Sequence, residues 1–184
     1  MKATGIVRRI DDLGRVVIPK EIRRTMRIRE GDPLEIYTDR EGEVIFKKYS
    51  PIGELAGFAG EYAETLHKVC GISVLIFDRD AVIASAGVPK REYLDKKMSE
   101  ELEEIAERRQ LYVRKSKEER ALAVMDGGTH YLSCAMPIIT EGDMIGCVCT
   151  VTSDDDQEKS GISAESEAKL IQTAAGFLSK QMES

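Results

Sequence analysis

The stretch RRIDDLGRVVIPKEIRRTM, residues 8–26, decides the fold of the first part of this chain. Its turn-forming residues, DDLG, stand between two short segments rich in β-branched side chains, residues 3–10 and 15–18. Because aspartate favours turns and glycine tolerates a positive φ, the pattern predicts two strands joined by a tight turn. Pro19 follows the second segment directly, and proline suits the first turn of a helix, where its missing N–H costs nothing. We therefore expect a strand, a turn, a strand and a short helix, in that order.

Residues 20–50 complete this first part of the chain. In the predicted helix, Ile22 and Met26 are four residues apart and form one buried edge. The segments PLEIYTD and EVIFKKY, joined by REG, predict a hairpin that ends near Tyr49. So few large apolar groups bury too little surface for independent folding, because below about 70–80 residues a single core seldom supplies more than about 3–5 kcal/mol. The part has no metal motif and no cysteine, so we expect an obligate dimer.

Basic side chains are concentrated in the same part of the chain. Residues 1–29 carry nine basic and three acidic side chains, a local charge of +6, whereas the whole chain of 184 residues carries −6. This contrast indicates two parts with two partners. Composition alone leaves open whether the basic part binds DNA, RNA or an acidic protein. It also leaves open that these arginines are solvated, pair with Asp12, Glu21 or Glu30, and bind nothing.

The rest of the chain, beyond the junction Ser50-Pro51, predicts a separate domain. Apolar helical stripes alternate there with short strand patterns. The predicted helices are residues 55–69, 99–109 and 163–182. The predicted strands are residues 72–77 and 81–86, two strand-like pieces at LYVRK and RALAVMD, and the hairpin HYLSCAMPII–TEGD–MIGCVCTVT. This order is typical of an α+β domain with a largely antiparallel sheet. The first and last helices place Phe58, Tyr62, Phe177 and Leu178 either in this core or against another subunit.

The N-terminal motifs also carry a family resemblance. The pieces G-I-V-R, D-x-L-G-R-V-V-I-P and E-I-R-R-T, in this order, make residues 1–50 resemble the AbrB-type transcription factors. The resemblance implies a swapped-hairpin barrel made by two chains, β-rich with one short helix per chain, that binds double-stranded DNA. With its acidic C-terminal region, the chain resembles sporulation regulators of this type. That implies a linker at residues 51–55 and a GAF-like domain, the small-ligand sensor fold, at residues 56–184.

Individual DNA contacts follow from this resemblance and from the local pattern. The family's contacts fall at the positions of Arg8, Arg15, Arg23 and Arg24, and we predict these four first, followed by Arg9 and Lys2. Adjacent strand residues point apart, so Arg8 and Arg9 share one DNA surface only if the strand twists strongly. No second recognition helix is present for a helix-turn-helix. We therefore expect readout through the shape and deformability of the duplex, with Asp11 and Asp12 serving the turn rather than the phosphates.

The four cysteines admit more than one interpretation. If TEGD closes the last hairpin symmetrically, Cys134 lies opposite Cys149, and Cys147 shares the face of Cys149. Such thiols can form a disulfide, hold a metal, or pack as small apolar side chains, and buried reduced thiols are the favoured interpretation. His67 and His130 have no metal-ligand spacing to them, so no metal site and no cofactor is expected.

The sequence therefore predicts a non-enzymatic, cytoplasmic protein, and the resemblance implies a regulator of sporulation genes that both activates and represses. We expect a dimer through the first part, a tetramer through the GAF-like domain, no membrane contact, and an unknown small-molecule ligand for that domain. A GAF-type thiol reductase is the rival class, and it would need a low-pKa thiol beside a resolving one. An antitoxin-like autoregulator is the third, although antitoxins of this fold usually carry a disordered toxin-binding tail.

Overall fold

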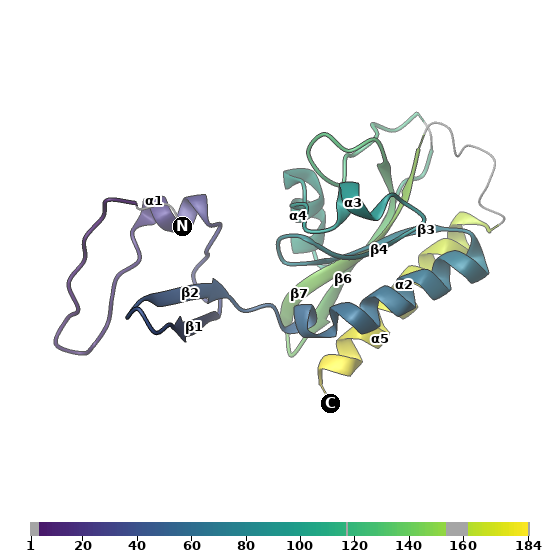
Figure 1. Cartoon of the computed structure of the whole chain (residues 1–184). Helices are drawn as coiled ribbons and strands as arrows, with labels where there is room; N and C mark the ends of the chain where they lie inside the picture. The colour runs from purple at the N-terminus through teal and green to yellow at the C-terminus, as the bar shows by residue number, and fades with distance from the viewer. Residues whose placement is uncertain (1–3, 117, 154–161, 184) are drawn as a thin grey trace. The chain divides into compact units, whose positions relative to one another are not determined.

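The computed structural model describes residues 4–116, 118–153 and 162–183. The chain divides into two compact units, Met1–Tyr49 and Ser50–Ser184, called the first and the second unit below (Figure 1). The boundary falls next to the proline of the Ser50-Pro51 junction.

The first unit contains the predicted short helix and the predicted hairpin. Helix α1 (Lys20–Thr25) begins directly after Pro19, which takes the position before the first helical residue. Strands β1 (Leu34–Thr38) and β2 (Val44–Lys48) pair antiparallel, with Ile36 opposite Phe46. The carboxylate of Asp39 closes the hairpin turn by accepting the N–H groups of Glu41 and Glu43, each at 2.9 Å. Turn chemistry read from the sequence thus produces this hairpin.

The strands predicted at residues 3–10 and 15–18 are absent from the single chain in the part that the structure describes. Residues 4–10 and 15–19 form no strand pairing with the other described residues, and most of their apolar side chains face solvent. Val7 is 87% exposed, Val17 is 71% exposed, and Ile36 of the hairpin is 61% exposed. Among the described residues of this unit, Pro19 alone is buried, so the unit has no core of its own. A strand needs a partner to satisfy its backbone groups, and one chain supplies none here.

The predicted apolar edge of the helix is likewise not buried by other described residues of the first unit. Ile22 is half-buried and Met26 is exposed, although both lie on the expected side of α1. The prediction of a buried edge is therefore wrong for one chain by itself, because the described residues of the first unit do not bury this side of α1.

The second unit is built on a five-stranded sheet that is antiparallel throughout, as predicted. Its strand order is β4-β3-β7-β6-β5. The strands are β3 (Ser73–Asp78), β4 (Val82–Ala86), β5 (Tyr112–Val113), β6 (Tyr131–Thr140) and β7 (Asp143–Thr152). The helices are α2 (Ala56–Cys70), α3 (Lys90–Tyr93), α4 (Glu100–Glu107) and α5 (Ala164–Met182).

The segment predicted as a linker, residues 51–55, belongs to the second unit instead. It forms a 3₁₀ helix, η1 (Pro51–Leu55), which Ser50 caps by accepting the N–H of Gly53 at 3.1 Å. Ile52 is fully buried in the core that α2 and α5 form with the sheet. A segment that buries an isoleucine is part of the domain, so the linker prediction is corrected.

Two hydrophobic cores lie on the two faces of this sheet. Helices α2 and α5 run side by side over one face, while α3 and α4 cover the other (Figure 1). On the α3–α4 face, Phe77, Tyr93, Leu102 and Met125 are buried together. Among the described residues, these side chains fill the space between the sheet and helix α4.

Gly146 allows the two central strands to approach closely. A Cβ at this position would lie 2.3 Å from the carbonyl oxygen of Phe77 on β3, a distance that no real side chain can adopt. Next to it, Ile138 pairs with Gly146 while Ile139 pairs with Met144, so Ile145 is an extra, bulged residue of β7.

Candidate nucleic-acid interface

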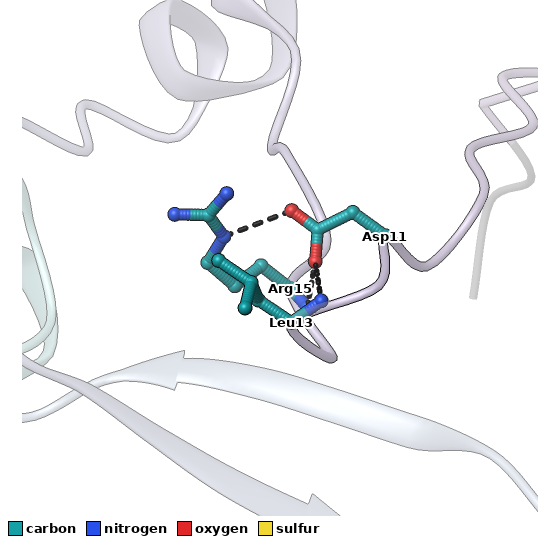
Figure 2. Close-up of polar contacts among 3 residues, drawn as sticks. All are labelled: Asp11, Leu13 and Arg15. Carbon is teal, nitrogen blue, oxygen red and sulfur yellow. Dashed lines mark hydrogen bonds and ion pairs between the residues drawn. The ribbon is translucent and has the colours of Figure 1, made fainter.

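The turn at residues 11–15 positions Arg15, one of the predicted DNA contacts (Figure 2). Asp11 accepts the N–H groups of Leu13 at 3.0 Å and of Arg15 at 2.8 Å through Oδ1, and the Nε–H of Arg15 donates to Oδ2 at 2.8 Å. The N–H of Gly14 donates to the Asp11 carbonyl at 3.0 Å, and Gly14 has a φ of +76°, which glycine adopts without strain. The predicted role of Asp11 in the turn is therefore confirmed.

The electrostatics of this turn favour a charged Asp11 and a guanidinium held in a fixed orientation. The backbone N–H of Arg15, and then its guanidinium, lower the pKa of the Asp11 carboxyl. A guanidinium has five N–H donors and Asp11 engages one, so the remaining donors of Arg15 can bind an anion. The sequence predicted the turn but not this contact, for which the i, i+4 spacing of D-x-L-G-R was the available signal.

The other predicted arginines are exposed. Arg8 and Arg9 precede the turn, and Arg23 and Arg24 lie in the last turn of α1. Within the described part of the first unit, none of these four forms an ion pair with Asp12, Glu21 or Glu30, which was the alternative left open by composition. Their charges are therefore available to a polyanion. Lys2, the sixth predicted residue, lies outside the described residues.

The predicted opposition of Cys134 and Cys149 in the second unit is wrong. Because Ile145 is bulged, the hairpin register shifts by one residue, and Cys134 pairs with Thr150 while Ala135 pairs with Cys149. A shift of one residue exchanges the faces of a strand. Cys134 belongs to the core under α2 and α5, whereas Cys147 and Cys149 belong to the core on the other face. The sheet therefore separates the two thiols, and a disulfide between them is excluded.

The thiols also lack the acidity that a reductase requires. Burial raises the pKa of Cys134 and of Cys147 to about 12 each, and it raises the pKa of Cys149 well above its ordinary value. Catalytic thiols have a lowered pKa, because the thiolate is the nucleophile. Cys134, Cys147 and Cys149 are therefore buried, protonated thiols that pack as apolar core side chains.

Alkylation of the native chain at pH 8 should begin at Cys70, which is half-buried, and leave Cys134, Cys147 and Cys149 unmodified. A thiol with a pKa of about 12 is ionised to only about one part in ten thousand at this pH. In the native state Cys134 and Cys147 stay protonated above pH 9.0, the ordinary pKa of a thiol, whereas in the unfolded chain they lose their protons there. The free energy of unfolding should therefore fall as pH rises from 9.0 toward 12. Mass spectrometry counts the labels, with the urea-unfolded chain as the fully reactive control. Rapid labelling of two buried thiols together with sulfoxide reductase activity would favour the reductase.

Neither histidine forms part of a metal site in the described ranges. His67 Nδ1 lies 2.9 Å from the Ile72 carbonyl oxygen, and His130 Nδ1 lies 2.6 Å from the Tyr93 hydroxyl. No group of three or more His, Cys, Asp or Glu side chains that could hold a metal ion occurs among the described residues. In the same residues, no helix is long and apolar enough to cross a membrane.

Comparison with known proteins identifies the family to which the whole chain belongs. A family model described as stage V sporulation protein T C-terminal, transcription factor, matches residues 54–183. Stage V sporulation protein T of Bacillus subtilis is 52% identical over 185 residues, which cover 100% of this chain and 99% of that protein. This chain belongs to the stage V sporulation protein T family. The family's description is that of a transcription factor, which implies a non-enzymatic protein.

The two units have relatives of their own. The transition state regulatory protein AbrB of Bacillus subtilis is 65% identical over 51 residues, 28% of this chain and 52% of that protein, so the first unit is an AbrB-type domain. A second family model, antidote-toxin recognition MazE, bacterial antitoxin, matches residues 7–53.

The second unit has the GAF fold. The GAF domain/HD domain protein from Geobacter sulfurreducens aligns with a TM-score of 0.51 at 14% identity, over 70% of this chain and 92% of that chain. The type II free methionine-R-sulfoxide reductase from Thermoplasma acidophilum aligns with a TM-score of 0.51 at 12% identity, over 72% of this chain and 95% of that chain. At these identities the likeness concerns the fold alone, so it assigns no reductase activity to this chain.

Proposed function

We propose that this protein is a regulator of sporulation genes that activates some genes and represses others by binding double-stranded DNA through its first unit. The observation that carries the proposal is the set of exposed guanidinium groups around one turn and one short helix, with Arg15 oriented by Asp11. The contact residues are Arg8, Arg15, Arg23 and Arg24, followed by Arg9 and Lys2. The 65% identity to AbrB, a transition state regulatory protein, supports the same function. A regulator of this kind acts in the cytoplasm, where the chromosome lies.

The DNA-binding unit is a dimer in this proposal. Its exposed valines and isoleucines, on the hairpin and on unpaired extended segments, supply both the apolar surface and the free backbone groups that a second copy would cover. A swapped-hairpin barrel buries these side chains and pairs these backbones. Dimerisation also doubles the basic charge on one particle, which strengthens the attraction to a duplex.

A second association through the GAF domain would join two such dimers. Phe58 and Tyr62 on α2 pack against Phe177 on α5, with ring centroids 5.7 Å and 5.5 Å apart. Phe177 is still 41% exposed, and Val69 on α2 is exposed as well. An aromatic patch along two neighbouring helices suits packing against its own copy in a tetramer, and two DNA-binding dimers on one particle would gain avidity.

Base recognition would depend on the shape of the duplex. The proposed cations come from a turn, extended segments and a helix of six residues, none of which can lie in the major groove as a long recognition helix does. Such contacts reach mainly phosphates and groove edges, so we expect a loose consensus and a preference for deformable sequences.

The salt dependence of DNA binding tests the proposal. If each of two chains neutralises about four phosphates, the logarithm of the association constant should fall against the logarithm of salt concentration with a slope of about −7. Fluorescence anisotropy of a labelled duplex, titrated with the full chain at several salt concentrations, measures this slope. A slope flatter than about −3 would contradict this surface as the main contact.

The match to the MazE antitoxin model favours one second candidate, an antitoxin-like autoregulator. That candidate needs a toxin-binding segment, whereas residues 50–184 fold as a domain with two cores. The GAF domain fits the sensing of a small molecule better than the wrapping of a toxin.

A further inference from the structure

A cavity of about 470 Å³ opens at one end of the sheet of the second unit. It lies where β3 begins and where β4 and β7 end, and both α2 and α5 contribute to its lining. The volume lies within the range of small-molecule sites in proteins. Its lining is unusually polar for such a site, with hydroxyl, imidazole, carboxylate and cationic side chains.

Gly87 shapes one wall of this cavity. It has a φ of +78°, and a Cβ there would lie 2.6 Å from Ser73 Oγ and 2.7 Å from His67 Nδ1. Ser73 Oγ instead donates to the Gly87 carbonyl at 3.1 Å. Because the Ile72 carbonyl can only accept, His67 Nδ1 must carry the proton of their 2.9 Å hydrogen bond.

Side chains of both charges line the cavity and come from separate elements. Arg114 and Lys115 follow β5, and Glu167 lies in the first turn of α5. The Thr150 hydroxyl, in a residue only 1% exposed, donates to Glu167 Oε1 and fixes this carboxylate, which leaves its second oxygen for a ligand.

The segment that carries the two cations is held by its own hydrogen bonds. Arg114 Nη2 donates to the Glu119 carbonyl at 2.9 Å, and Glu119 Oε2 accepts the Lys115 N–H at 3.0 Å. The Arg114 N–H also donates to the Ser133 carbonyl on β6 at 2.8 Å. These bonds reduce the entropy that a ligand would otherwise spend on ordering the segment.

We propose that this cavity binds a small zwitterion of the α-amino-acid class. The ligand's carboxylate interacts with Arg114 and Lys115, and its ammonium group interacts with Glu167. A simple anion is disfavoured because it would meet the Glu167 carboxylate, and a simple amine is disfavoured because it would meet the two cations. The proposal rests on the sensing role proposed above for the GAF domain, and it names the site and the ligand class.

Calorimetric titration of the full chain with each of the twenty common amino acids, without DNA, tests this site. At least one amino acid should bind, while its N-acetyl and its carboxamide derivatives, which each lack one charge, should bind at least about tenfold more weakly. Absence of binding by all twenty, or equal binding by acetate, would overturn the proposal.

Two substitutions locate the binding in this cavity. Glu167→Gln keeps an acceptor for Thr150 but removes the charge, and Lys115→Met removes an exposed cation whose side chain forms no hydrogen bond or ion pair with the described residues. Each should weaken the amino acid at least about tenfold, whereas Glu165→Gln, a matched loss of charge on the same helix outside the cavity, should change it less than about twofold. Unchanged binding in both cavity variants would overturn the assignment. Because the same preparation is tested for DNA binding separately, loss of this site and failure of the proposed DNA-binding function are distinguishable.

Discussion

Replacing Arg8, Arg15, Arg23 and Arg24 together with glutamine should lower the affinity of the full chain for duplex DNA by at least about a thousandfold at about 0.1 M salt. In the proposed dimer the change removes eight cations from one surface, and with them the counterion release that drives non-specific affinity. The salt slope should flatten toward zero in parallel, because it counts the phosphates that are neutralised. Anisotropy titrations of the variant and the native chain, at matched salt concentrations, measure both quantities.

A control variant separates this effect from a loss of total charge. Lys68, Lys96, Lys97 and Lys169 are exposed cations of the second unit, and changing these four to glutamine removes the same charge elsewhere. Their surface ion pairs, such as that of Lys169 with Glu165, contribute at most about 1 kcal/mol to stability. This control should bind DNA within about tenfold of the native chain. If the arginine variant did the same, the first unit would not be the DNA-binding surface.

The first unit shows how far local sequence can specify structure. Asp11, Gly14 and Pro19 fix the turn and the helix start through their own backbone and side-chain chemistry, so these elements are predictable and are present. The β-branched residues on either side of the turn have a high strand propensity, but a single chain supplies no partner strand with which they could pair. Whether they become strands depends on a partner, which no local pattern encodes. Which arginines contact DNA likewise stays a prediction.

The second unit differs from its sequence-based prediction where strands meet at close range. Helices and strands followed from periodicity, but the position of the bulge at Ile145 depends on how Gly146 meets Phe77, which is far away in the sequence. That single bulge reversed the expected arrangement of Cys134 and Cys149. The cavity was equally hidden, because His67, Arg114 and Glu167 lie far apart in the chain and belong to no motif. Long-range register and convergence of distant residues are tertiary properties.

Substituting Ile36 with glutamate should abolish assembly through the first unit. Ile36 lies opposite Phe46 on the hairpin and is 61% exposed in one chain, so it is a central candidate for burial against a second copy. Burial of an isoleucine contributes about 1.5–3 kcal/mol per chain, and an unpaired carboxylate in its place would add a larger cost. The variant should therefore lose the fold of this unit, and DNA binding with it.

Native mass spectrometry of the full chain measures this change directly. The native chain should assemble as a tetramer, and Ile36→Glu should halve the assembly to dimers that remain joined through the GAF domain, with residues 1–49 readily cut by trypsin. Arg40→Glu, which places a carboxylate in the exposed turn of the same hairpin, is the matched control and should keep the tetramer. If Ile36→Glu halved the assembly but left residues 1–49 resistant to trypsin, the first unit would fold within one chain, and the dimeric DNA-binding surface would then be excluded. An unchanged tetramer would contradict burial of Ile36 in the assembly. The first unit exposes its valines and isoleucines and has no core, so it is stable only when a second copy covers these side chains. Folding of the first unit and its assembly are therefore one equilibrium.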